Sequence, residues 1–420
     1  MEMVQVVFLT VLVFFVLVSI HEFGHFYFAK RAGVLVREFA IGFGPKLFSI
    51  KRGESRFTLR LLPIGGFVRM AGEDPEVVEV QAGHTVGVRI KDDKVTRIYL
   101  DRLDERTQIL RGEVTAIDLE RHLYLTLDVD GDVQRYDVHP QALIVAKGRD
   151  TQIAPLDRQF GSASAGKKAM TIFAGPLMNF ILAFVLFAVF FQSYGVAVEP
   201  NTKIFINEVT ADGAAKAAGL QKGDLVVSVN GVAVEGDSQK LSQAITGSAG
   251  KPMNWIVDRD GQQVKITVTP SASTGKVGIV MAPEMRHPGF GETFSLAGHA
   301  MVDSTKKIFD GFRKIIFGEV KLEELNGPVG TAQVTVEIAK QGVTQLTWWG
   351  AILSLYLGIF NLLPIPALDG SRLLFIGIEA IRGRPVDPNR ESLVHFIGFA
   401  ALMLLMVVVT YNDIIRLVKG

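Results

Sequence analysis

Two histidines and a glutamate with the spacing of a metal site occur near the N-terminus. His21, Glu22 and His25 form an H-E-x-x-H motif, and the apolar stretch before it carries no charge from Met3 to Ile20. Residues four positions apart share a face of a helix, so the two imidazoles can point at one metal ion. Glu22 is placed to take a proton from a water that the metal activates. The motif therefore predicts a hydrolytic zinc site.

The apolar setting decides between a chemical and a structural interpretation of this motif. The structural alternative is that His21, Glu22 and His25 are buried and stabilised by packing alone. Ionisable side chains within a membrane-length segment are costly and need a partner, and a shared metal ion supplies one for all three. We therefore favour a metal site, and we expect it to lie inside the membrane.

A carboxylate far along the chain is the expected third ligand. Pro364 and Pro366 end an apolar helix and free backbone groups, which a membrane protein tolerates only against protein or water. Asp369 follows directly. Two imidazoles, one carboxylate and an open position for water make a catalytic zinc site. The alternative for Asp369 is a residue that marks a helix end at the membrane interface.

Four apolar runs are long enough to span a bilayer, which takes about 20 helical residues. They are Met3–Ala29, Met170–Phe191, about Thr347–Leu363 and about Val394–Val409. Basic residues follow the first run at Lys30 and Arg31 and precede the second at Lys167 and Lys168. Because cytosolic flanks are enriched in Lys and Arg, both termini are predicted outside the cell and the H-E-x-x-H motif near the cytosolic side.

The segments between the spans read as β-rich or interfacial. Residues 33–69 are aromatic and β-branched with Gly and Pro, which indicates either a cytosolic hairpin or a sheet that dips into the membrane. Residues 70–160 alternate like a small cytosolic β-rich insertion. Residues 293–345 mix apolar and basic side chains, as amphipathic helices on the outer membrane surface do. In the second span, Asn179 is a polar group that needs a hydrogen-bond partner. Its role is either to hold membrane helices together or to act near the metal site.

Residues 200–283 form an external part that resembles a bacterial PDZ domain. The resemblance rests on Gly219-Leu220, Gly223-Asp224 and Val229-Asn230-Gly231. It implies capture of an extended peptide or a free C-terminus by strand addition. The alternative is a steric plug over the membrane site.

The composition of the whole chain limits which classes of protein and which kinds of metal site it can represent. The chain has 420 residues, 48% of them hydrophobic, which fits a mixture of membrane spans and soluble parts. A net charge of +1 gives no reason to propose nucleic acid as a partner. The chain has no cysteine, so disulfides and Cys-ligated metal sites are excluded.

Taken together, the motifs resemble the site-2 protease family of intramembrane zinc metalloproteases, most closely its bacterial RseP/RasP branch with a single PDZ domain. The motifs that carry the resemblance are His21-Glu22-Phe23-Gly24-His25, Ala40-Ile41-Gly42-Phe43-Gly44-Pro45, Leu62-Pro63-Ile64-Gly65-Gly66-Phe67-Val68, Ala174-Gly175-Pro176 with Asn179, Gly327-Pro328-Val329-Gly330, and Asn361 through Gly370. One departure is Ser371, where these proteins often carry a second Gly after the Asp-Gly pair. It lies outside the ligand set.

The resemblance implies a role for each candidate residue. His21, His25 and Asp369 would ligate Zn²⁺, and Glu22 would be the general base. Substrate or oxyanion support would come from Asn361, Gly65, Gly66 and Asn179, with residues 57–69 as a re-entrant β-structure that pairs with substrate. The implied substrates are transmembrane segments of membrane proteins, such as pre-cut anti-sigma factors and remnant signal peptides, in a bacterial cell membrane.

These inferences combine into one expected architecture, a polytopic α-helical membrane protein with four transmembrane helices, a membrane-associated β-structure, a cytosolic β-rich insertion and an extracytoplasmic PDZ domain. The expected segments are 1–32 (first membrane helix, H-E-x-x-H), 33–69 (β-hairpin region), 70–160 (insertion), 167–192 (second membrane helix), 200–283 (PDZ domain), 293–345 (interfacial helices), 346–370 (third membrane helix with the Leu368-Asp369-Gly370 motif), 371–393 (cytosolic loop) and 394–412 (fourth membrane helix). Two alternatives to an intramembrane protease stay open. One is a membrane-anchored zinc protease whose cytosol-facing site cuts soluble or misfolded proteins. The other is a non-enzymatic scaffold built on the PDZ domain.

Overall fold

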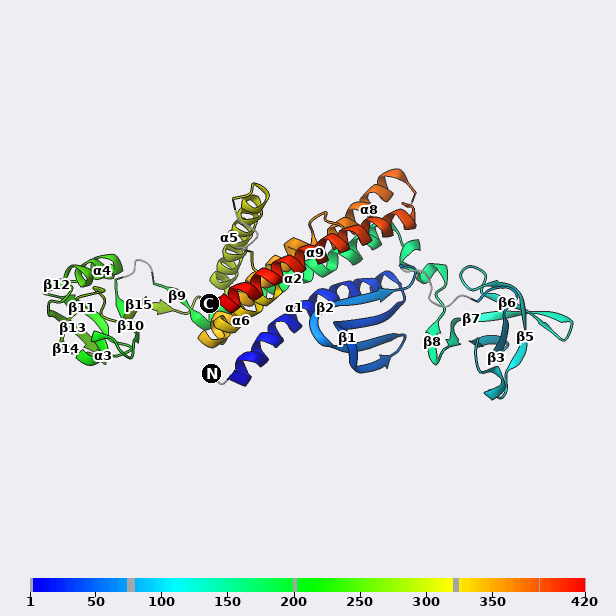
Figure 1. Cartoon of the computed structure of the whole chain (residues 1–420), viewed down its shortest axis with the longest axis horizontal. Helices are drawn as coiled ribbons and strands as arrows, with labels where there is room; N and C mark the ends of the chain where they lie inside the picture. Colours follow the sequence, from blue (N-terminus) through cyan, green and yellow to red (C-terminus); the bar gives the residue numbers. More distant parts are fainter. Residues whose placement is uncertain (1–2, 74–79, 199–201, 320–324, 385, 420) are drawn as a thin grey trace. The chain divides into compact units, whose positions relative to one another are not determined.

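A computed structural model describes residues 3–73, 80–198, 202–319, 325–384 and 386–419. It divides into two compact units, which are described separately (Figure 1). The first unit comprises Met1–Phe187 and His299–Gly420, and the second comprises Ala188–Gly298.

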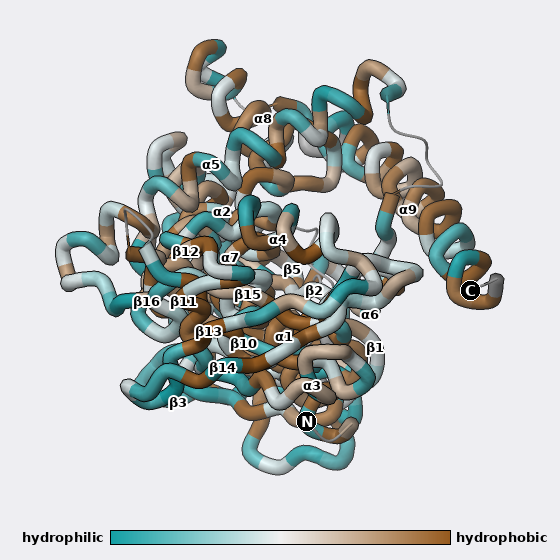
Figure 2. The backbone as a smooth tube through the Cα atoms, turned by 90° about the vertical axis from the view of Figure 1, so that its left-hand side faces the viewer, coloured by the Kyte–Doolittle hydropathy of each residue, from teal (hydrophilic) through white to brown (hydrophobic). Residues whose placement is uncertain are grey.

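Four helices in the described part of the chain are long and apolar enough to cross a membrane. They are α1 (Met3–Ala32), α2 (Ala165–Tyr194), α7 (Val343–Asn361) and α9 (Pro388–Lys419). Helix α9 leaves large apolar side chains such as Phe399, Leu404 and Val407 exposed, and its tube is mostly brown in Figure 2. A long helix with apolar side chains on its outside is stable in lipid, where its backbone is satisfied internally. The protein is therefore a polytopic membrane protein.

Helices α1 and α2 pack at very short range where small residues meet. A Cβ added to Gly24 of α1 would lie 2.3 Å from the carbonyl oxygen of Ala174 in α2. A Cβ added to Gly175, the next residue of α2, would lie 2.2 Å from Nε2 of His25. Small residues let membrane helices approach closely, since no side chain separates the backbones. The Ala174-Gly175 pair thus fixes α2 against the histidine face of α1.

Strands β1 (Val36–Arg52) and β2 (Ser55–Met70) form an antiparallel sheet that folds back on itself. Glu38 of β1 pairs with Arg56 near the start of β2 and with Arg69 near its end. The first part of β1 therefore lies between the two halves of β2. Phe26 of α1 packs edge-on against Phe39 and Phe57, with each ring centroid 5.5 Å away. These aromatic contacts hold the sheet on helix α1.

The insertion that follows is a closed sheet with its own core. Its strands are β3 (Thr85–Lys91), β4 (Lys94–Tyr99), β5 (Leu110–Asp118), β6 (Tyr124–Val129), β7 (Asp132–Ala146) and β8 (Arg149–Gln152). They run in the order β4-β3-β5-β6-β7-β8, and an additional parallel pairing of β4 with β7 closes the sheet. Fully buried apolar residues such as Val86, Ile98 and Leu125 fill its interior. Because apolar side chains alternate along each strand, one face of the sheet forms this core.

The second unit is a six-stranded sheet with two short helices. Its strands are β10 (Ile204–Val209), β11 (Leu225–Val229), β12 (Val232–Ala233), β13 (Met253–Arg259), β14 (Gln262–Val268) and β15 (Ile279–Pro283), and its helices are α3 (Ala214–Ala218) and α4 (Ser238–Gly247). The main order is β14-β13-β11-β10-β15, so β15 lies at an edge. The buried indole of Trp255 and the side chains of Leu220 and Leu241 form its core. Strands β9 (Val196–Ala197) and β16 (Met285–Arg286) pair antiparallel in a separate two-stranded sheet.

The remaining α-helices of the described residues are α5 (Phe290–Ile316), α6 (Pro328–Gln341) and α8 (Asp369–Arg382). The segment 371–393, predicted to be a cytosolic loop, is helical at both ends, with residues 371–382 in α8 and residues 388–393 in α9. Leu373 and Ile376 of α8 pack with Ala29 and Ile172, so burial of one apolar face favours a helix there.

Helix α6 is held at its N-terminus by a side chain from α9. The carboxylate of Asp413 accepts hydrogen bonds from the backbone N–H groups of Gly327 and Gly330, at 3.2 and 2.8 Å. A carboxylate at a helix N-terminus satisfies N–H groups that have no partner inside the helix. Residues 327–330 are thereby tied to the end of α9.

Candidate metal centre

The two histidines of the H-E-x-x-H motif lie on one face of α1, one turn apart. His21 and His25 are both buried, and their ring centroids are 4.8 Å apart in an edge-to-face arrangement. Their Nε2 atoms approach to 3.2 Å. Helical periodicity alone produces this pairing, because residues four apart stack on the same side.

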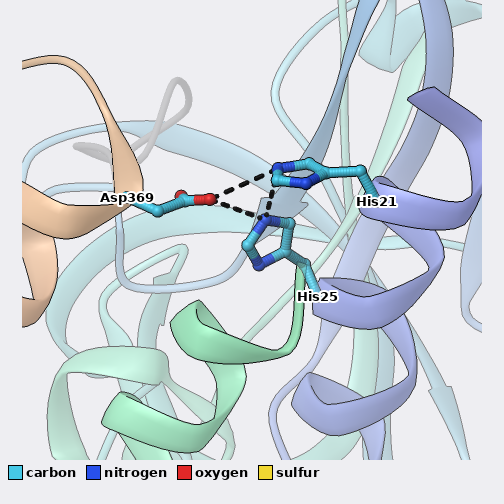
Figure 3. Close-up of side chains that lie close together, drawn as sticks. All are labelled: His21, His25 and Asp369. Atoms are coloured by element: carbon cyan, nitrogen blue, oxygen red, sulfur yellow. Dashed lines mark hydrogen bonds and ion pairs between the residues drawn. The ribbon is translucent and has the colours of Figure 1, made fainter. Parts of the chain in front are cut away.

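Asp369 reaches the same point from a different part of the chain. It is the first residue of α8, and its Oδ2 lies 3.3 Å from Nε2 of His21 and 3.3 Å from Nε2 of His25. Figure 3 shows the three side chains pointing at one another, the histidines from α1 and the aspartate from α8. Among the described residues these three form a group that could hold a metal ion.

The spacing of the three donor atoms fits a tetrahedral zinc site. Ligand atoms about 2.1 Å from a tetrahedral zinc lie roughly 3.4 Å from one another. The three distances here, 3.2, 3.3 and 3.3 Å, agree with that value. Oδ2 of Asp369 is buried, and no hydrogen-bond donor in the described chain satisfies it. A cation among the three donors would give this oxygen its partner.

The far side of each imidazole is held by helix α2. Nδ1 of His25 lies 3.0 Å from the carbonyl oxygen of Thr171, to which it can donate its hydrogen. Nδ1 of His21 lies 3.2 Å from Nδ2 of Asn179, and Oδ1 of Asn179 has no hydrogen-bond partner in the described chain. Rotating that amide lets Oδ1 accept from Nδ1–H of His21. Both contacts leave Nε2 free to bind a metal.

Glu22 lies beside this cluster and against the sheet. Its side chain is buried, at 8% exposure. A Cβ added to Gly66 of β2 would lie 2.7 Å from Cγ of Glu22 and 2.8 Å from the carbonyl oxygen of Ala40. Because Gly66 has no side chain, β2 can pass directly over Glu22.

Two of the candidate substrate-contact residues have other contacts. Gly65 has a φ of +76°, and a Cβ there would meet the ring of Phe43 at 2.5 Å. Asn361 donates from Nδ2 to the carbonyl oxygen of Leu357 at 3.0 Å, one turn earlier in α7. Among the described hydrogen bonds, Asn361 makes none to the histidines or to Asp369. Of the four candidates, Gly66 and Asn179 contact the H-E-x-x-H motif directly.

Some residues at the site escape sequence reasoning. The carbonyl of Thr171 is a backbone group, so residue type gives no indication of it. Lys168, buried near the start of α2, binds the carboxylate of Glu379 in α8 at 2.8 and 3.1 Å. This pair joins the helix that supports His25 to the helix that begins at Asp369. Its residues are unremarkable in the sequence, since charges flank most membrane helices.

Comparison with known proteins gives matches that span nearly the whole chain. The family model of peptidase family M50 matches residues 9–405. "Zinc metalloprotease RasP" of Geobacillus kaustophilus is 45% identical over 409 residues, covering 96% of each chain. "Regulator of sigma-W protease RasP" of Bacillus subtilis is 42% identical over 418 residues, covering 97% of each. "Probable protease eep" of Enterococcus faecalis is 39% identical over 423 residues, covering 97% of this chain and 98% of that one.

The family match and the relatives agree with one another and with the motifs that carry the expected chemistry. The family model spans residues 9–405, so the match includes both the α1 and the α8 parts of the site. This chain belongs to peptidase family M50, the site-2 type of intramembrane zinc metalloprotease.

Proposed function

We propose that this chain cleaves transmembrane segments of other membrane proteins at a zinc ion held by His21, His25 and Asp369. The observation that most supports this proposal is that one carboxylate oxygen of Asp369 lies close to Nε2 of both His21 and His25. The two histidines lie in α1, a helix long and apolar enough to span a membrane. Ionisable groups placed so in a bilayer are functional by default.

Glu22 is the proposed general base. Bound zinc would supply Lewis-acid polarisation of the scissile carbonyl and would acidify a water molecule. Glu22, one residue after His21 on α1, takes a proton from the attacking water and passes it to the leaving amine nitrogen. His21 and His25 are kept in one tautomer by Asn179 and Thr171, so their orientation does not change between these steps.

The sheet β1–β2 is the proposed substrate platform. A helical substrate cannot be attacked directly, because each carbonyl is engaged in i to i+4 hydrogen bonding. Residues 66–70 of β2 pair with β1 on one side, and no further described strand pairs on the other. An unwound substrate segment can add to this edge by backbone hydrogen bonds and pass over Gly66 next to Glu22.

The second unit is proposed to be an extracytoplasmic PDZ domain that reads or filters substrate ends. Its strand β15 lies at an edge of the sheet and is preceded by Gly278, a small residue with a φ of +81°. A peptide end can extend a sheet at such an edge. The proposed topology has both termini outside, the insertion in the cytosol and the metal centre near the cytosolic face, in a bacterial cell membrane.

The proposed substrates are transmembrane segments that have one free end. A relative is named a regulator of sigma-W protease, and that name supports membrane-anchored anti-sigma factors, trimmed by an earlier external cut, as one substrate class. Remnant signal peptides are a second class, since they too are short transmembrane helices with one free end.

The test separates metal binding from catalysis. Glu22→Gln removes the base but keeps all three donor atoms, so the purified variant should retain one zinc per chain and lose cleavage of a model transmembrane substrate in detergent. Asp369→Ala should lose both zinc and cleavage. Full activity of Glu22→Gln would remove Glu22 from the mechanism, and full zinc content of Asp369→Ala would remove Asp369 from the ligand set.

A further inference from the structure

The loop that delivers Asp369 contains a strained residue. Residues 362–368 link α7 to α8, and within them Ala367 has a φ of +76°. This left-handed conformation is unfavourable for a residue with a Cβ and persists only where surrounding contacts hold it. Asp369 follows two residues later. Its position therefore depends on what holds Ala367.

Helix α9 makes the holding contact through a histidine. The backbone N–H of Ala367 donates to Nδ1 of His395 at 3.2 Å. Since Nδ1 accepts, the ring hydrogen of a neutral His395 is on Nε2, which faces Oε1 of Glu391 at 3.7 Å. The ring of His395 also packs edge-on against Phe375 of α8, with centroids 5.6 Å apart. His395 thus contacts both the loop and the helix that Asp369 begins.

A second contact lies one turn further along α9. A Cβ added to Gly398 would lie 2.1 Å from Cβ of Pro366, so the loop presses on the bare backbone of α9. His395 and Gly398 occupy one face of α9, because they are three residues apart on a helix. That face of α9 therefore contacts the loop at two successive residues, Pro366 and Ala367.

We propose that His395 is a positioning residue for the metal centre. By accepting from Ala367 N–H, it holds the left-handed turn that places the Asp369 carboxylate opposite His21 and His25. The inference rests on the proposed function, since it gives Asp369 the role of zinc ligand. It adds a contribution from α9, a helix that carries none of the three donor atoms.

The first test changes the acceptor and measures zinc affinity by chelator competition on the purified full-length protein. His395→Phe keeps the ring that packs on Phe375 but removes the acceptor, and zinc binding should weaken about 10-fold, as for other residues that orient metal ligands. His395→Asn places an oxygen near the position of Nδ1 and should restore affinity to within about 3-fold of wild type. Phe396→Leu, a change at a neighbouring exposed side chain of α9, should leave affinity unchanged.

Two further variants keep the test decisive. His395→Gln places its side-chain oxygen near the position of Nε2 instead of Nδ1, so zinc binding should weaken. This variant therefore tests the acceptor role should His395→Phe fail to fold. Ala367→Gly removes the penalty for a positive φ. Combined with His395→Phe or His395→Gln, it should recover most of the lost affinity, which a packing role for His395 would not produce.

The outcomes separate this inference from the function on which it rests. Wild-type affinity in both His395→Phe and His395→Gln would overturn the positioning role while zinc binding and cleavage by the wild type stand. Equal losses in His395→Asn and His395→Phe, with no recovery from Ala367→Gly, would also overturn it. A wild-type protein that binds no zinc would instead overturn the proposed function.

Discussion

Gly175 of α2 presents a bare backbone to the imidazole of His25: a Cβ at this position would lie 2.2 Å from Nε2 of the ring. The same nitrogen faces Oδ2 of Asp369 at 3.3 Å. The absence of a side chain at Gly175 is therefore what lets α2 lie close enough for Thr171 to hold the ring from its other side.

A methyl group at Gly175 should displace the histidine. Gly175→Ala would force the ring of His25 away from its place beside Asp369, so zinc content and cleavage should fall together, by about 10-fold or more. Gly166→Ala is the matched control, since Gly166 lies in the same helix and nothing is within 4 Å of an added Cβ there. Metal analysis of both purified variants checks the prediction, and a fully loaded Gly175→Ala protein would contradict it.

A methyl group at Gly66 should have a different effect. The added Cβ would meet Cγ of Glu22 and the carbonyl oxygen of Ala40 within 3 Å, while all three donor atoms stay in place. Gly66→Ala should therefore keep its zinc but lose about 100-fold in kcat, the scale of a misplaced general base. Paired measurement of zinc content and single-turnover cleavage tests this. Loss of zinc in Gly66→Ala would show that the sheet supports the ligands rather than the base.

An ion pair outside the membrane spans should make stability depend on pH. Glu54 lies between β1 and β2, and its carboxylate accepts from Nη1 and Nη2 of Arg158 at 3.0 and 2.8 Å. These bonds, with help from Gln152 and Lys30, lower the pKa of Glu54 from 4.5 to about 2. A carboxyl whose pKa is lowered by folding stabilises the fold above its unfolded pKa, and this contribution is lost as the pH falls through the folded value.

The matched variant gives the size and direction of this effect. Glu54→Gln should lower the free energy of unfolding by about 1 kcal/mol at pH 7, the scale of a partly exposed pair. The difference between variant and wild type should stay constant down to about pH 4.5 and vanish toward pH 2. Thermal unfolding of both proteins in detergent across this range measures it. A difference that grows on acidification would contradict the assignment.

Removing one partner of the buried pair of Lys168 and Glu379 should destabilise the protein more than removing both partners. Lys168 is 5% exposed, so removing Glu379 alone leaves a buried charge unpaired and should cost about 3 kcal/mol. The double variant Lys168→Met with Glu379→Met should be closer to wild type than either single variant. Unfolding midpoints of the four proteins form the test, and additive losses would rule out the coupling.

The part of the site on α1 could be predicted from the sequence because it is local. Helical spacing alone brings His21 and His25 together, and no distant contact is needed. Asp369 could be predicted as the third metal ligand from its chemistry. Its approach to the imidazoles, however, depends on how α7, the loop and α8 are packed. The contribution of His395 could not be foreseen, because a single histidine in an apolar helix carries no pattern.

The same division holds for the fold. The four long apolar runs predict a polytopic membrane protein, since length and hydropathy alone decide that point. The loop expected at 371–393 is partly the helix α8, whose apolar face has the short length that a sequence pattern resolves poorly. Closure of the insertion through the parallel pairing of β4 and β7 is a non-local event, and alternation along each strand does not reveal it.

The double pairing of Glu38 with Arg56 and Arg69 has a consequence for where a bound chain is cut. Both sides of the first part of β1 are already paired, so a substrate segment that adds to this half of the sheet, as we propose, would pair with the free side of residues 66–70. In that case the distance along the substrate from its paired residues, more than the identity of the residues at the cut, would select the bond that is cleaved. On the proposed binding mode, substrates of unrelated sequence should yield fragments that end at the same depth in the membrane.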